Sequence, residues 1–161
     1  MPSDTEILEA VRAAFGDCPR PEHFTDYRHC EECREHDDLL RSRDPESLRV
    51  EDVGNPGWNP LCFISPEGFA YYMPALARLA SDEPDAAHAW YGPQLLFHLT
   101  YGGEDNRHRK SFSPTQRRAV AGLLAHLLET RAELAREHAC ADELIQAIDL
   151  WSEPGASTEP V

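Results

Sequence analysis

The sequence has little positive charge. Its 161 residues include 15 basic and 29 acidic side chains, so the formal net charge at pH 7 is −14. Lys110 is the only lysine. Proteins bind nucleic acid largely through Lys and Arg side chains that displace counterions from phosphates. The charge therefore argues against nucleic acid or an anionic membrane as a partner. An acidic surface is typical of simple solvation, and it can also attract a cation or a basic protein partner.

Long hydrophobic runs are also missing. No segment approaches the roughly 18 consecutive apolar residues of a membrane span. The start, MPSDTEILEA, has neither the basic residues nor the apolar centre of a secretory signal. We therefore expect a cytoplasmic protein. In that reducing compartment the five cysteines should be mostly reduced, so a Cys-x-x-Cys pair indicates a metal or redox element in preference to a disulfide.

Short catalytic motifs are absent as well. The sequence contains no G-x-S-x-G, no Walker loop, no G-x-G-x-x-G and no H-E-x-x-H. These motifs mark nucleophilic hydrolases, nucleotide-binding loops and zinc proteases. We therefore favour a binding or accessory role over an enzyme.

Helical periodicity and Ser-Pro helix starts run along most of the chain. They predict an all-α fold, with a single compact domain of about five helices over residues 1–151. The expected helices are 4–15, 26–43, 66–80, 84–100 and 114–151, the last with a break near 138–142. Ser65 and Ser113 each precede a proline, which is a strong N-cap and first-turn pattern.

Four further segments are predicted to lie outside these helices. The apolar run LCFI at 61–64 should be a short extended segment, and 46–49 should form at most one helical turn. Residues 101–110 are predicted to be a polar loop. The Pro-, Gly- and Ser-rich stretch 152–161 is predicted to be a flexible C-terminal tail.

The stretch HFTDYRHCEECREH at 23–36 holds two cysteines and three histidines. On a helix, Cys30 and Cys33 lie on one face because they are three residues apart. Two thiolates in this arrangement can bind a tetrahedral Zn²⁺, with His29 or His36 as the third ligand. The fourth ligand must then come from outside the helix. The candidates are His23, Cys18 and Cys62.

Three other hypotheses remain open for this chain. Cys30 and Cys33 are alternatively small side chains that pack beside Leu40. They are alternatively a redox dithiol, since a helix start stabilises a thiolate, although Glu31, Glu32 and Glu35 oppose that effect and favour a bound cation. Finally, small size and acidity fit an inhibitor of a basic protein, such as a toxin-neutralising immunity protein.

The remaining histidines give weaker signals. Three Asp-x-x-His pairs have the spacing of carboxylate and imidazole ligands on a helix, namely Asp26/His29, Asp85/His88 and Asp105/His108. His98 and His126 stand between apolar residues, and we expect them to be partly buried or interfacial residues and not metal ligands.

Two parts of the sequence together resemble a known family. They are HCEEC, which follows a helix containing Ala14-Phe15, and PLCFISPEGFAYYMPAL at 60–76. This combination resembles a family of small bacterial proteins with a Cys-x-x-Cys element followed by a Ser-Pro-Glu helix that carries paired tyrosines and a proline. The resemblance covers most of residues 5–80. It implies a compact cytoplasmic helical domain and no known reaction, so it assigns no catalytic residues.

Overall fold

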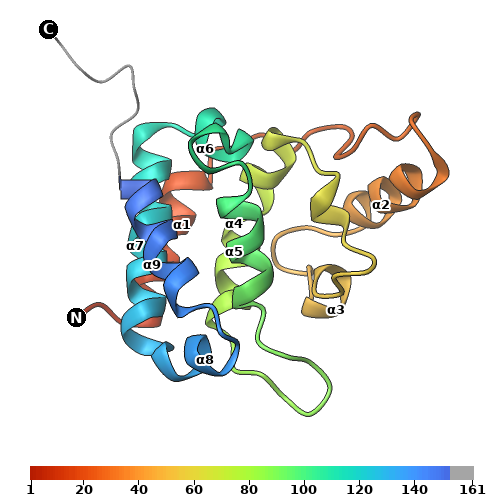
Figure 1. The fold of residues 1–161 in the computed structure, drawn as a ribbon. Coiled ribbons are helices and arrows are strands. Elements are labelled where there is room, and N and C mark those ends of the chain that lie inside the picture. Colours follow the sequence, from red (N-terminus) through yellow and green to blue (C-terminus); the bar gives the residue numbers. More distant parts are fainter. Residues whose placement is uncertain (153–161) are drawn as a thin grey trace, which may run out of the picture.

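The computed structural model describes residues 1–152, and in this part of the chain every regular element is helical (Figure 1). The all-α prediction is confirmed. The elements are α1 (Asp4–Phe15), α2 (Glu31–Arg41), α3 (Val50–Val53), η1 (Pro60–Cys62), α4 (Pro66–Ser81), α5 (Gly92–Thr100), η2 (Gly103–Asp105), α6 (Arg107–Ser111), α7 (Pro114–Thr130), α8 (Ala132–Glu137) and α9 (Ala141–Ser152), where η denotes a 3₁₀ helix. None of these helices is both long and apolar enough to cross a membrane.

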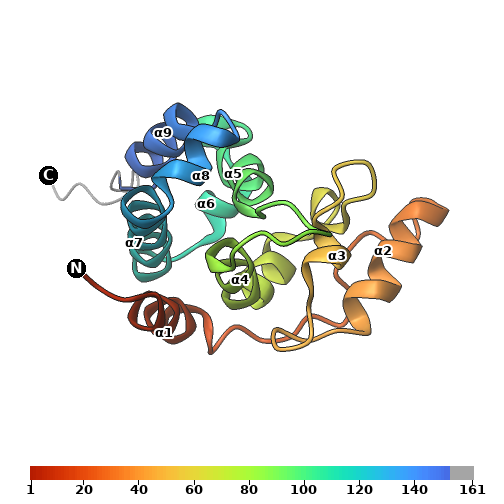
Figure 2. The ribbon, with the colours of Figure 1, turned by 90° about the horizontal axis from the view of Figure 1, so that it is seen from below.

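The central helix is α4. Eleven of its 16 residues are buried, which is the pattern of a helix covered on several faces. It packs against α1, α5 and α6, while α7 packs against α1 and α9. Figures 1 and 2 show α1, α7 and α9 on one side of α4, with α2 and α3 at the opposite end of the molecule. Residues 23–41, which form α2 and the loop before it and are called the arm below, lie at this end, where Leu40 joins α2 to the common core.

Serine caps define the three best-predicted helix starts. Ser3, Ser65 and Ser113 each accept a hydrogen bond from the backbone N–H three residues later, at the starts of α1, α4 and α7. Pro66 and Pro114 occupy the first helical position, where a missing N–H costs nothing. The α4 helix continues through Pro74.

The prediction of about five helices was too low, since the described residues form nine α-helices. The predicted helix 26–43 begins only at Glu31, because Cys30 is its N-cap. The predicted helix 84–100 begins only at Gly92. Asp85 accepts hydrogen bonds from the backbone N–H groups of Ala87 and His88, both at 2.8 Å, and so forms a turn that competes with a helix.

Shorter segments also differ from the prediction. The segment 61–64 is not extended: Asn59 caps the 3₁₀ helix η1 over its first part. Residues 45–47 form a hydrogen-bonded turn, in agreement with the prediction of at most one helical turn at 46–49. A short helix that was not predicted follows at Val50–Val53, where Asp52 accepts a hydrogen bond from the Arg49 N–H at 2.9 Å. The predicted polar loop 101–110 contains η2 and most of α6.

The last predicted helix is divided twice. A break occurs at 138–140, as expected, and Ala139 there has a positive φ of 54°. A second break at Arg131 separates α7 from α8 and was not predicted. The α9 helix includes Ser152, and the rest of the predicted tail lies outside the described residues.

Candidate metal centre

The loop before α2 is held by one buried carboxylate. Asp37 is 1% exposed, and its Oδ1 accepts hydrogen bonds from the backbone N–H groups of Phe24 (2.6 Å) and Thr25 (3.2 Å). Its Oδ2 accepts a hydrogen bond from Nδ1 of His23 at 2.7 Å. The Thr25 hydroxyl in turn donates to the backbone carbonyl of Cys33 at 2.6 Å. Residues 23–25 are therefore fixed against the helix that carries the two cysteines.

Cys30 begins this helix as its N-cap. Its backbone is extended, with φ −161° and ψ 173°, and its Sγ accepts a hydrogen bond from the Cys33 N–H at 3.4 Å. This is the position at which Ser, Thr, Asp or Asn is usually found, because a side-chain acceptor there satisfies one of the free N–H groups of the first turn. The Cys30 side chain is exposed.

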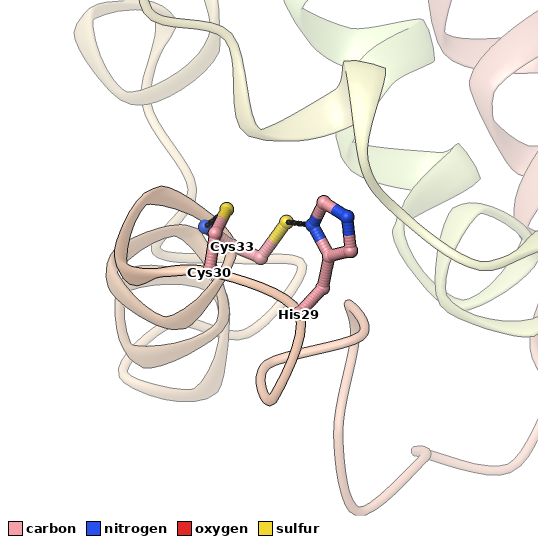
Figure 3. A group of neighbouring side chains, drawn as sticks. All are labelled: His29, Cys30 and Cys33. Atoms are coloured by element: carbon pink, nitrogen blue, oxygen red, sulfur yellow. Dashed lines mark hydrogen bonds between the residues drawn. The ribbon is translucent and has the colours of Figure 1, made fainter.

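His29, Cys30 and Cys33 form one group, with their ligand atoms all within 4.8 Å of one another. Figure 3 shows the sulfur of Cys33 directed at the ring of His29, where the Sγ to Nδ1 distance is 3.7 Å. His29 is brought there by a turn in which its N–H donates to the Asp26 carbonyl at 3.0 Å. Cys33 is 4% exposed, whereas His29 is exposed.

The pKa values of the two thiols are shifted in opposite directions. Hydrogen bonding from the backbone N–H of Cys33, and then from the Cys33 and His29 side chains, lowers the pKa of Cys30 below its usual value. Burial, and then the Cys30 side chain, Asp26 and Glu32, raise the pKa of Cys33 to about 11. A cation at this position would oppose the raised pKa, because metal ligation favours the thiolate form.

His23 and His36 lie outside this group. The His23 ring stacks on Tyr27, with centroids 3.9 Å apart, and is bonded to Asp37. The His36 ring is fully buried against Trp58 and Phe63, and its Nε2 donates to Glu32 at 3.2 Å. The helix start at Glu31 explains the difference, since His29 then precedes the helix and is free to fold back over Cys33.

Neither of the other two candidates for the fourth ligand joins the group. Cys18 accepts a hydrogen bond from Gln116 of α7 at 3.4 Å, and Cys62 lines a separate cavity. All five cysteines are free thiols. Within residues 1–152, only three protein ligands therefore converge on the candidate centre.

The Asp-x-x-His pairs do not form further centres in the described part of the chain. His88 lies 3.3 Å from Asp85 and 3.0 Å from Glu51, which makes it part of a surface ion-pair cluster. His98 and His126 are 5% and 3% exposed, so the prediction that they are buried is confirmed.

Sequence reasoning missed the residues that position the centre. Asp37 and Thr25 were not among the candidate residues that the sequence pattern indicated for the centre. The available signal was the late run of acidic residues on α2, since an Asp buried on the inner face of a helix needs backbone or cationic partners. No protein-family model, curated protein or solved structure matches the chain.

Proposed function

We propose that this chain is a binding or accessory protein that carries a structural Zn²⁺ on His29, Cys30 and Cys33. The observation that carries the proposal is the convergence of the three ligand atoms within 4.8 Å. Two thiolates bound to one tetrahedral Zn²⁺ at about 2.3 Å lie about 3.8 Å apart. A movement of about 1 Å or less therefore closes the group around the ion.

The surroundings support a cation at this position. Exposed Glu31 and Glu35 flank the two cysteines, and the whole chain carries a net charge of −14. The ion would join the loop at His29 to the first turn of α2, so that its binding energy stabilises the arm. Water or a group of a partner would occupy the fourth position, and the acidic surface favours a basic protein as that partner.

Zinc analysis of protein purified without chelator tests the proposal. We expect about one equivalent of zinc in the wild type and less than about a tenth of an equivalent in Cys30→Ser and Cys33→Ser. Cys62→Ser is the matched control, because it removes an exposed thiol outside the group and should retain zinc. Wild-type protein with less than about a tenth of an equivalent of any transition metal would overturn the proposal.

Substitution by Co²⁺ tests the ligand set itself. Thiolate ligands give Co²⁺ intense charge-transfer absorption, and tetrahedral geometry gives strong visible bands. We expect both in the wild type, a weaker charge-transfer band in Cys33→Ser, and a shifted visible band in His29→Gln. Equal spectra for the wild type and His29→Gln would remove His29 from the site.

A second candidate function is thiol redox exchange. The specific observation in its favour is the exposure of Cys30 beside the buried sulfur of Cys33. In this mechanism the Cys30 thiolate attacks a partner disulfide and forms a mixed disulfide. Cys33 then attacks Cys30, which releases the partner as a dithiol and leaves a Cys30–Cys33 disulfide, so two electrons pass to the partner.

The two functions make opposite predictions for the isolated protein. A redox dithiol should reduce insulin disulfides in the presence of dithiothreitol, and Cys33→Ser should trap a mixed disulfide with the substrate. A structural zinc site should do neither, and zinc should protect both thiols from iodoacetamide. Turnover of insulin by the zinc-free protein would favour the redox function.

A further inference from the structure

A cavity of about 480 Å³ lies away from the candidate metal centre. It is bounded by residues 61–63, by the end of α5 and by the segment 101–108. Its volume is in the usual range of small-molecule sites. None of the residues that line it belongs to the group of His29, Cys30 and Cys33.

The wall formed by residues 98–109 is held rigid by Asn106, which is 2% exposed. Its side-chain N–H groups donate to the carbonyls of His98 (2.8 Å) and Tyr101 (2.9 Å). Its Oδ1 accepts from the N–H groups of His108 (3.1 Å) and Arg109 (3.0 Å). This single side chain ties the end of α5 to α6, so the cavity is largely preformed.

Arg107 supplies a positive charge to the cavity without a compensating partner. Within residues 1–152 its guanidinium makes no ion pair or hydrogen bond, although the protein has a large excess of carboxylates. Among residues 1–152, the only acidic side chain on the cavity wall is Asp105, which is paired with Lys110 at 3.0 Å. Within the described part of the chain, the cavity therefore carries an unpaired cation in a strongly acidic protein.

Two neutral histidines add hydrogen-bond donors to the same wall. Asn59 Nδ2 donates to His98 Nε2 at 3.2 Å, so the proton of the His98 ring is on Nδ1. Burial and the Arg107 charge lower the pKa of His98 to about 4 and that of His108 to about 3. His108 is 2% exposed, lines the cavity, and has no hydrogen-bond partner for its ring among the described residues.

Aromatic rings form the rest of the opening. Phe63, Phe97 and Tyr101 all line the cavity, and they are 39%, 48% and 72% exposed. Large apolar side chains are rarely exposed together without a function. Their faces offer stacking surfaces at the mouth of a site whose wall carries a guanidinium and imidazole groups.

We propose that this cavity binds a small aromatic anion, such as an aromatic carboxylate or sulfonate, with the anionic group on Arg107 and the ring against Phe97 and Phe63. Arg binds planar carboxylates through two parallel hydrogen bonds, which suits it to this role. The histidines remain neutral at pH 7 and supply donors to the anion. Because the proposal uses none of the zinc ligands, its test is independent of the test of the proposed function.

The fluorescent sulfonate 1-anilinonaphthalene-8-sulfonate is the first probe. We expect saturable binding to the wild type at one site, with displacement by sodium 2-naphthoate. The uncharged 2-naphthalenemethanol has the same ring system and should displace the dye at least about tenfold more weakly. Non-saturable dye binding, or equal displacement by the acid and the alcohol, would overturn the proposal.

Two variants test whether the dye binds in this cavity. Arg107→Gln should weaken the dye and 2-naphthoate by about tenfold or more while leaving the alcohol unchanged. Arg118→Gln is the matched control, because Arg118 is an exposed arginine of α7 outside the cavity. Equal affinities for the two variants would place the dye elsewhere and contradict the proposal.

A further variant tests the contribution of the aromatic rings to binding. Phe97→Ser should weaken all three compounds, since the ring surface serves charged and uncharged ligands alike. Phe97 is 48% exposed, so this change should leave the urea midpoint close to that of the wild type. Unchanged binding in Phe97→Ser, at an unchanged midpoint, would exclude the proposed orientation.

Discussion

The Sγ of Cys30 accepts a hydrogen bond from the backbone N–H of Cys33 at 3.4 Å. The first cysteine of the Cys-x-x-Cys element therefore serves as the N-cap of α2, and the second is the third residue inside the helix. This relationship couples the structure of the arm to the chemistry of the thiols. Any substitution of Cys30 changes a helix cap as well as a candidate ligand, and the two effects must be separated.

Substitution of Cys30 by serine and by alanine separates the capping effect from the loss of a zinc ligand. Cys30→Ser replaces the sulfur with a better capping acceptor, so the melting temperature of the zinc-free protein should be unchanged or slightly higher. Cys30→Ala removes the cap and should lower the melting temperature by roughly 2–4 °C. Both variants should lose zinc. Thermal unfolding in the presence and absence of a chelator measures both effects, and a Cys30→Ser variant that still gains stability from zinc would contradict the assignment.

Asp37 should be the most sensitive residue of the arm outside the ligands. Asp37→Ala leaves the buried N–H groups of Phe24 and Thr25 without an acceptor, which should cost roughly 3 kcal/mol or more in the free energy of unfolding. Zinc affinity should also fall, by about tenfold, because the loop that positions His29 loosens.

Urea unfolding of the zinc-free protein and a competition assay with a chromophoric chelator measure these two quantities. Asp38→Ala is the matched control, since Asp38 is the next residue on α2 and is exposed. Similar losses of stability and zinc affinity in the two variants would show that the effect at Asp37 reflects helix content and not the hydrogen bonds to residues 23–25.

Helix starts with local signals were predictable, and those set by distant contacts were not. Ser3, Ser65 and Ser113 find their hydrogen-bond partners three residues away, so the sequence pattern alone locates them. The start of α2 depends on Asp37, which holds residues 23–25 in a non-helical conformation from a position 12 to 14 residues further on. Local helix propensities do not include that contact, so they could not predict where α2 begins.

In the candidate sites, too, local spacing was predictable and distant contacts were not. The proximity of Cys30 and Cys33 followed from their spacing, whereas the choice of His29 over His36 depends on where α2 begins and on the packing of His36 against Trp58 and Phe63. The cavity around Arg107 was not predicted, because it joins residues 61–63 to residues 97–108, and only the tertiary fold brings these segments together.

The N-terminus of α1 is attached to α7 and α8 through Asp4. Its carboxylate accepts hydrogen bonds from Arg131 at 2.8 and 3.0 Å and from His126 at 2.6 Å. Hydrogen bonding to Arg131, and then to His126, lowers the pKa of Asp4 from 3.8 to about 2. This interaction stabilises the fold above pH 3.8 and is lost as the pH falls towards 2.

Asp4→Asn should therefore be less stable than the wild type at pH 7, with a difference that shrinks below pH 3.8. Because the Asp4 side chain is 44% exposed, solvent screening limits the expected difference to about 1 kcal/mol. Urea unfolding at pH 7 and pH 3 measures it. A stability difference that is independent of pH would mean that the carboxylate charge does not contribute.

His108 should control the stability of the protein in mild acid. Its ring stacks on Phe69 with centroids 3.8 Å apart, and its buried Nδ1 has no hydrogen-bond partner among residues 1–152. The folded protein has a His108 pKa of about 3, against an ordinary value of 6.5. Between these values the unfolded chain binds a proton that the folded chain does not, so stability falls as the pH falls from 6.5 towards 3.

His108→Phe should remove this loss. At pH 5 the histidine costs the folded state about 2 kcal/mol relative to pH 8, and phenylalanine keeps the stacking without the titration. The gain from His108→Phe should therefore be larger at pH 5 than at pH 8 by about that amount in urea unfolding. Phe112→Leu controls for packing, since it changes the same cluster without a titrating group and should shift stability equally at both pH values. A pH-independent effect of His108→Phe would show that His108 gains its proton at the same pH in the folded and unfolded chains.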